Sequence, residues 1–147
     1  MNATGDAPRL IISDIDGTFI TSAGRVTDRL RTVIVRAVES GAHFGLATGR
    51  PHRWLIPVLE QLPIAPVCVC ANGAVVYDPA SDRVLHAYEL APAAMAEVVE
   101  VAERVLAGVP HGYGVERVGS SALDPEEECF IITPEYNRDA WDSQFGV

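Results

Sequence analysis

Lysine is missing from this sequence. All 11 basic residues are arginines, and they face 20 aspartates and glutamates, so the formal net charge is −9. Because nonspecific binding to nucleic acid or to an anionic membrane depends on positive charge, we expect neither as a partner. A small phosphorylated substrate remains compatible with this charge, since nearby arginines and a metal ion can dominate the electrostatics of a single pocket.

Cysteines are few, and long hydrophobic runs are absent. The 3 cysteines, Cys68, Cys70 and Cys129, are odd in number and too sparse for a disulfide framework. Cys68 and Cys70 lie two apart on a predicted strand, so we expect both to point one way and to be buried as small apolar groups. No apolar run has the length of a membrane span, and the N-terminus lacks the pattern of a signal peptide. The sequence therefore predicts a cytoplasmic protein with reduced thiols.

The remaining composition is that of a packed globular protein. The 147 residues are 48% hydrophobic and 21% charged, enough for one domain or slightly more. Short apolar stretches alternate with helical patterns, which predicts an α/β fold with right-handed crossovers and a parallel sheet. The predicted strands span residues 10–14, 42–47, 67–70, 74–78 and 83–90, followed by extended segments at 112–118 and 129–133. The predicted helices span residues 28–40, with Thr27 as N-cap, 51–62 and 92–107.

Polar residues follow the first three predicted strands at the point where each strand ends. The first group is Asp14-Ile15-Asp16-Gly17-Thr18. Open α/β sheets bind ligands at the carboxyl ends of their strands. Two carboxylates one residue apart repel each other unless something neutralises them, and a divalent cation is the usual remedy. Alternatively, Asp16-Gly17 only shapes a turn.

The second group, Thr48-Gly49-Arg50, could bind an anion, and the third, Asn72-Gly73, could form a turn. In Thr48-Gly49-Arg50, a hydroxyl and free amides at a helix N-terminus would suit a phosphate, although a threonine N-cap explains the same residues. Arg50 could reach a substrate anion, but an arginine in a first helical turn is more often solvated. Asn72-Gly73 after the third strand is also typical of an ordinary hairpin turn.

Together these three groups resemble the motifs of the haloacid dehalogenase (HAD) superfamily, and of its Cof-like branch, subclass IIB, in particular. The resemblance implies a Rossmann-like parallel-sheet core in residues 1–83 and part of an inserted α/β cap domain in residues 84–147. It also implies a role for each site residue. Asp14 would be the nucleophile and Asp16 the general acid/base, both also serving as Mg²⁺ ligands; Thr48, Gly49 and Arg50 would bind phosphate; and Asn72 and Gly73 would form the hinge to the cap.

The function implied is that of a Mg²⁺-dependent phosphatase acting on a small phosphorylated metabolite, such as a sugar phosphate, through an aspartyl-phosphate. Two later motifs of the family are missing from the sequence: a third motif that carries a lysine or arginine, and an acidic Gly-Asp-x-x-Asn-Asp-like motif that completes the metal site. The acidic stretch 124–128 is no substitute, because it lacks the glycine and a preceding apolar strand. The sequence thus resembles the N-terminal half of a hydrolase, truncated after the first part of the cap.

Two consequences follow from that resemblance. One is an alternative function: a non-catalytic HAD-like protein that binds anions or a partner. The other concerns assembly. In the family, strands that come after the cap flank the strand bearing Asp14. Without them, Leu10-Ile11-Ile12 would form an open apolar sheet edge, a known site of strand pairing between chains. A second copy of the chain, a separate partner carrying the missing half, or residues 129–133 folding back could cover this edge. A second copy is the most available of these, so we expect the chain to form a homodimer through this edge or to aggregate.

Overall fold

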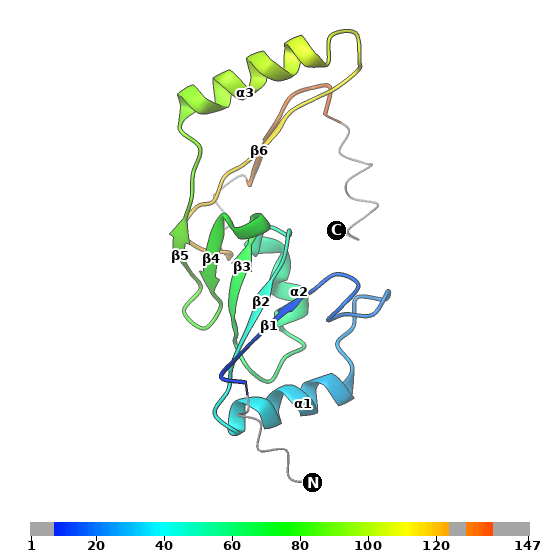
Figure 1. The fold of residues 1–147 in the computed structure, drawn as a ribbon, viewed down its shortest axis with the longest axis vertical. Coiled ribbons are helices and arrows are strands. Elements are labelled where there is room, and N and C mark those ends of the chain that lie inside the picture. Colours follow the sequence, from blue (N-terminus) through cyan, green and yellow to red (C-terminus); the bar gives the residue numbers. More distant parts are fainter. Residues whose placement is uncertain (1–7, 124–128, 137–147) are drawn as a thin grey trace. The chain divides into compact units, whose positions relative to one another are not determined.

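A computed structural model of the chain describes residues 8–123 and 129–136 (Figure 1). The acidic stretch 124–128 lies outside the described residues. The chain divides into two compact units, one comprising Met1–Tyr88 with Gly119–Asp124, the other Glu89–Val118 with Pro125–Val147. No helix in the described part combines the length and the apolar character needed to cross a membrane. The assignment of residues 1–83 to a catalytic core and of residues 84–147 to a cap domain remains a prediction.

The first unit contains a mixed sheet that confirms the α/β class. Within the described residues it has five strands in the order β1-β2-β3-β4-β5 (Figure 1). The first three are parallel, and β4 and β5 continue the sheet as antiparallel strands. Their bounds are Leu10–Asp14 for β1, His43–Ala47 for β2, Val67–Cys70 for β3, Val75–Asp78 for β4 and Arg83–Ala87 for β5.

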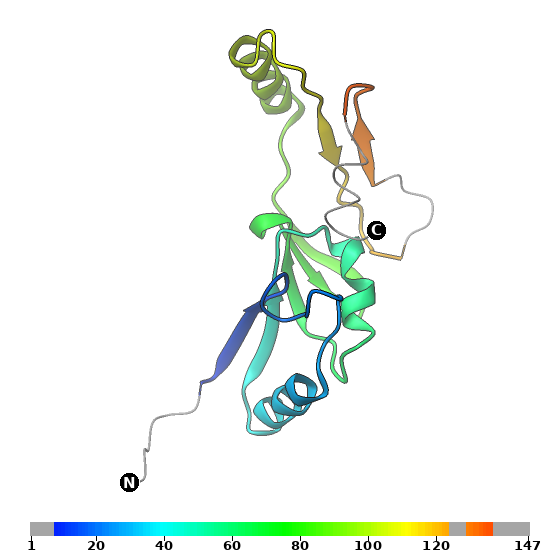
Figure 2. The same ribbon diagram turned by 90° about the vertical axis from the view of Figure 1, so that its right-hand side faces the viewer.

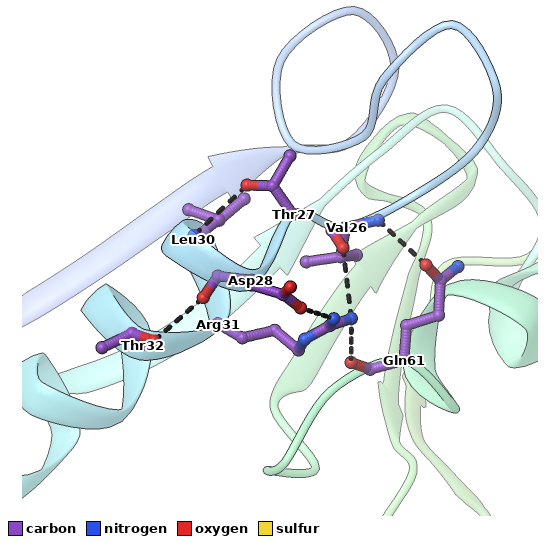
Figure 3. A network of polar contacts seen from close by, with 7 residues as sticks. All are labelled: Val26, Thr27, Asp28, Leu30, Arg31, Thr32 and Gln61. Atoms are coloured by element: carbon purple, nitrogen blue, oxygen red, sulfur yellow. Dashed lines mark hydrogen bonds and ion pairs between the residues drawn. The ribbon is translucent and has the colours of Figure 1, made fainter.

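The crossover after β1 contains α1, Asp28–Glu39, whose start is tied to a distant loop (Figure 3). Thr27 is the N-cap, as predicted: its hydroxyl accepts a hydrogen bond from the Leu30 amide. The side chain of Gln61 accepts from the Val26 amide at 2.9 Å. Arg31 donates to the Val26 carbonyl at 3.1 Å and to the Gln61 carbonyl at 3.5 Å. These bonds fix the beginning of α1 against the loop that precedes β3.

The second crossover differs from the single helix predicted over residues 51–62. It consists of a short 3₁₀ helix, His52–Leu55, and a single α-helical turn, α2, Ile56–Leu59. Pro57 lies in the first turn of α2. Since proline has no amide hydrogen, it cannot donate to the carbonyl four residues earlier, and one continuous helix is interrupted there.

The described hydrophobic core lies entirely in the first unit. Cys68 and Cys70 are fully buried in it, which confirms their predicted place, and burial raises the pKa of the Cys68 thiol to about 12. Burial of apolar surface is the main stabilising contribution to such a core. Its members are Ile15, Phe19, Val26, Ile34, Ala42, Leu46, Leu55, Val58, Cys68, Cys70, Val75 and Tyr77.

The second unit is described only in part. It contains α3, Pro92–Val105, and an antiparallel pair of short strands, β6, Gly114–Glu116, and β7, Phe130–Ile132 (Figure 2). The predicted helix at 92–107 and the extended segments at 112–118 and 129–133 are thus confirmed, with shorter bounds. None of the residues of α3 is buried. Burial within the described residues therefore does not stabilise this helix as it does the sheet of the first unit.

Candidate functional site

The first part of the site is the loop that follows β1. Asp14 is the last residue of the strand, pairs in register with Ala47 of β2, and is exposed. The next residue, Ile15, is fully buried, and its carbonyl accepts hydrogen bonds from the amides of Phe19 at 2.9 Å and Ile20 at 3.2 Å. With Ile15 and Phe19 anchored in the core, the chain between them must face outward.

Asp16 therefore lies in an exposed tight turn, and Gly17 makes the turn possible. The φ angle of Gly17 is +72°, a conformation that side chains with a Cβ rarely adopt. The two carboxylates, Asp14 and Asp16, are thus exposed on either side of a buried isoleucine, at the carboxyl end of a parallel strand.

The second part of the site follows β2. The Thr48 amide donates to the carbonyl of Val69 in β3 at 2.9 Å, and Thr48 is only 7% exposed. Its hydroxyl accepts from the Arg50 amide at 3.1 Å. The alternative of a threonine N-cap is wrong, because the N-cap of the following helix is Pro51. That helix is a single short 3₁₀ segment, so an aligned helix dipole contributes little here.

The third part is the connection between β3 and β4, which contains Asn72 and Gly73. Three successive residues have positive φ angles: 50° for Ala71, 55° for Asn72 and 100° for Gly73. The segment joins two antiparallel strands, so it is a hairpin connection, with four residues rather than two. A positive φ is costly for an alanine, so other contacts must hold the turn in this conformation.

Hydrogen bonds to the second part of the site provide these contacts. The Ala71 amide donates to the Arg50 carbonyl at 2.9 Å, and the Asn72 amide donates to the Thr48 carbonyl at 3.2 Å. A Cβ added to Gly49 would lie 3.0 Å from Oδ1 of Asn72, so the two segments approach closely. The predicted phosphate-binding residues and the predicted hinge residues are therefore joined by backbone hydrogen bonds.

An ion pair joins the first part of the site to the second. Nε of Arg50 lies 2.9 Å from Oδ2 of Asp16, and Nη2 of Arg50 lies 2.6 Å from Oδ1 of Asp16. The Arg50 side chain is 14% exposed and that of Asp16 is 44% exposed. The alternative of a solvated Arg50 is therefore wrong. No local sequence pattern indicated this pair, because its members lie on loops that follow different strands.

The chemistry of the available donors suits a hard cation only in part. Asp14 offers an exposed carboxylate, and Asp16 offers its backbone carbonyl, since its side chain is paired with Arg50. Oxygen donors of this kind suit Mg²⁺, which keeps several waters in its shell. Across residues 8–123 and 129–136, no group of three or more histidine, cysteine, aspartate or glutamate side chains could hold a metal ion. The donors therefore fit a weakly held, mostly hydrated ion.

Comparisons with known proteins show which family the chain resembles. A family model described as haloacid dehalogenase-like hydrolase matches residues 11–111. Phosphatase YwpJ of Bacillus subtilis is 34% identical over 71 residues, which cover 48% of this chain and 25% of that protein. Pyridoxal phosphate phosphatase YbhA of Escherichia coli is 32% identical over 79 residues, which cover 54% of this chain and 29% of that protein. The chain thus matches little more than a quarter of the length of these relatives.

Two solved structures share the fold. A haloacid dehalogenase-like hydrolase from B. subtilis aligns with a TM-score of 0.56 at 28% identity, over 66% of this chain and 34% of its own. A sugar phosphatase of HAD subclass IIB aligns with a TM-score of 0.52 at 18% identity, over 66% of this chain and 38% of its own, which is a likeness of fold alone. With a family model matching most of its length, the chain belongs to the haloacid dehalogenase-like hydrolases.

Proposed function

We propose that the protein containing this chain is a Mg²⁺-dependent phosphatase that hydrolyses a small phosphorylated metabolite, such as a sugar phosphate, through an aspartyl-phosphate. The observation that carries the proposal is the pair of exposed carboxylates, Asp14 and Asp16, at the end of β1, with Arg50 paired to Asp16. The relatives named as phosphatases support the reaction class. We further propose a cytoplasmic location.

In the first half of the proposed reaction, a carboxylate oxygen of Asp14 attacks the phosphorus atom of the substrate. The bond between phosphorus and the leaving oxygen breaks as the new bond forms. Asp16, protonated at that stage, gives its proton to the leaving alkoxide, so that an alcohol departs. The Thr48 and Gly49 segment and the Arg50 guanidinium bind the phosphoryl oxygens.

In the second half, Asp16 accepts a proton from a water molecule as that water attacks the phosphorus atom of the aspartyl-phosphate. Inorganic phosphate leaves and the Asp14 carboxylate is restored. Asp14 and the Asp16 carbonyl would hold Mg²⁺, whose charge offsets the repulsion between a carboxylate and a phosphate. Asn72 and Gly73 act as the hinge between the catalytic part and the cap.

Two features of the described residues favour the second candidate function, a non-catalytic HAD-like protein that binds anions or a partner. Only Asp14 and Asp16 are at hand as metal ligands, and Arg50 is occupied by Asp16. In addition, β1 pairs with β2 alone among the described strands, and Leu10 and Ile12 are 60% and 50% exposed. We propose that this edge pairs with a second copy of the chain.

Replacement of Asp14 separates the two candidates. We expect Asp14→Asn to abolish hydrolysis of p-nitrophenyl phosphate, because an amide oxygen is a poor nucleophile, while thermal unfolding stays unchanged. The matched control is Asp28→Asn, which removes an exposed carboxylate at the start of α1 and should leave turnover intact. Near-normal turnover in Asp14→Asn would reject the nucleophile. Absence of Mg²⁺-dependent turnover in the wild-type chain and in the longest natural form of the protein would favour the binding function.

A further inference from the structure

We propose that Arg50 is an exchangeable clamp, whose guanidinium holds the Asp16 carboxylate in the resting site and moves to the phosphate when an anion arrives. This inference rests on the proposed function, because it concerns the same phosphate site. It gives Arg50 a role beyond binding phosphate, namely to keep Asp16 out of action until a phosphate is present.

The first argument is the geometry of the pair. Two parallel bonds, 2.9 Å from Nε to Oδ2 and 2.6 Å from Nη2 to Oδ1, engage both oxygens of Asp16. A guanidinium presents the same planar fork to a carboxylate and to a phosphate. An anion at Thr48 and Gly49 would therefore compete with Asp16 for one set of donors.

The second argument is that hydrogen bonds fix the backbone of Arg50 independently of its side-chain ion pair. The Arg50 amide donates to the Thr48 hydroxyl, and its carbonyl accepts from the Ala71 amide. Exchange therefore requires only rotation about side-chain bonds, and no movement of the strand end. The 44% exposure of Asp16 leaves its side of the pair open to solvent and to an incoming anion.

The third argument is the direction of the competition. A phosphate dianion carries more charge than a carboxylate and has more acceptor oxygens, so it makes the stronger charge-assisted bonds with a guanidinium. In the proposed reaction Asp16 must exchange a proton with the leaving group, and both of its oxygens are engaged by Arg50 in the resting site. Transfer of the guanidinium to phosphate releases Asp16 when the acid/base is required.

The test is a titration of this chain with inorganic phosphate in buffer containing Mg²⁺. Calorimetry gives the affinity, and the ¹⁵N-detected Nε–H signal of Arg50 reports the partner of the guanidinium. The proteins are wild type, Asp16→Asn, Arg50→Ala, Arg50→Lys and the double variant Asp16→Asn with Arg50→Ala. Asp28→Asn is the control, since it removes an exposed carboxylate that belongs neither to the clamp nor to the proposed metal site. Thermal unfolding of each variant establishes that it is folded.

We expect the Arg50 signal to shift on phosphate addition, and Asp16→Asn to bind phosphate about tenfold more tightly than wild type, a change of about 1.4 kcal/mol. The gain should vanish in the double variant and be absent in Asp28→Asn. Arg50→Lys should bind more weakly than wild type, because an ammonium keeps the charge but not the fork.

Three results would overturn the clamp. A gain that persists without Arg50 would mean that removal of negative charge alone explains the effect. Shifts at the Thr48 and Gly49 amides with an unmoved Arg50 signal would leave the phosphate site standing and reject the exchange. No response at any of these three residues would reject the phosphate site itself, together with the clamp.

Discussion

The phenol of Tyr77 donates a hydrogen bond to Oδ1 of Asp82 at 2.8 Å, and this pair organises the return of the chain to the first unit. The same carboxylate accepts from the Ala122 amide at 2.9 Å and from the Ser121 hydroxyl. Partial burial alone would raise the pKa of Asp82, but these hydrogen bonds lower it below its ordinary value. The Val84 amide completes the attachment by donating to the carbonyl of Ser120.

We therefore predict that Asp82→Ala destabilises the first unit by about 2–3 kcal/mol, because several hydrogen bonds to a charged group are lost. Asp82 also has a φ angle of 48°, which alanine tolerates less well than asparagine. Asp82→Asn should therefore cost less than Asp82→Ala. Urea unfolding followed by fluorescence measures both. An Asp82→Ala variant as stable as wild type would contradict the role of this carboxylate.

A second prediction concerns the pH dependence of stability. His52 is fully buried, and desolvation lowers its pKa from 6.5; Arg53 lowers it as well, whereas the Ser121 carbonyl and Asp82 oppose the shift. The unfolded chain therefore binds a proton more readily than the folded one. The stability that neutral His52 contributes to the fold is therefore present above pH 6.5 and is lost as the pH falls below that value.

The expected observation is a fall in the free energy of unfolding between pH 7.5 and pH 5.5 that is reduced in His52→Gln. The shifted pKa values of Asp82 and His111 do not produce the same fall in this pH range. Asp82, with its lowered pKa, acts at more acidic pH, and His111, with its raised pKa, changes stability in the opposite direction. His86→Gln, which removes an exposed histidine, is the control and should retain the wild-type slope. Equal slopes in wild type and His52→Gln would reject this prediction.

A third prediction concerns metal affinity. Asp14 and the Asp16 carbonyl are too few donors for a tight Mg²⁺ site, since this ion binds best with several carboxylate or phosphate oxygens. We expect a millimolar dissociation constant or weaker in this chain, about −4 kcal/mol at most. Calorimetry that gave a micromolar value would mean that a further carboxylate completes the shell.

A fourth prediction concerns the open edge at β1. We expect this chain to dimerise at micromolar concentration, and Leu10→Lys combined with Ile12→Lys to shift it toward the monomer, because charges on an edge strand oppose pairing. Leu85→Lys is the control: it places a lysine at a 55% exposed site on β5, at the opposite edge of the sheet. Sedimentation velocity distinguishes the species. A compact wild-type monomer would reject the dimer.

A fifth prediction concerns the thiols. Cys68 and Cys70 are fully buried, and the pKa of Cys68 is raised to about 12 by burial, so little thiolate forms at neutral pH. Neither should react with a thiol reagent in the native protein, whereas all 3 cysteines should react in urea. Mass spectrometry after labelling identifies the modified residues. Rapid native labelling of Cys68 would show that the sheet opens easily.

The sequence alone was sufficient for several local features of this protein. The alternation of apolar runs with helical patterns predicted the α/β class and the strands that carry Asp14 and Thr48. A hydroxyl at residue 27 before a helical pattern predicted the N-cap of α1. These features depend on backbone preference and on periodic burial, both of which are set by residues close together in the chain.

Only the tertiary structure decided the relations between distant segments. Three contacts each join loops that lie apart in the sequence: the ion pair of Arg50 with Asp16, the hydrogen bond from the Ala71 amide to the Arg50 carbonyl, and the hydrogen bond from the Ser121 hydroxyl to Asp82. The interruption at Pro57 was readable in principle, but the helical pattern outweighed it in the prediction. A residue's partner across a fold depends on how whole elements pack, and no pattern within one element specifies it.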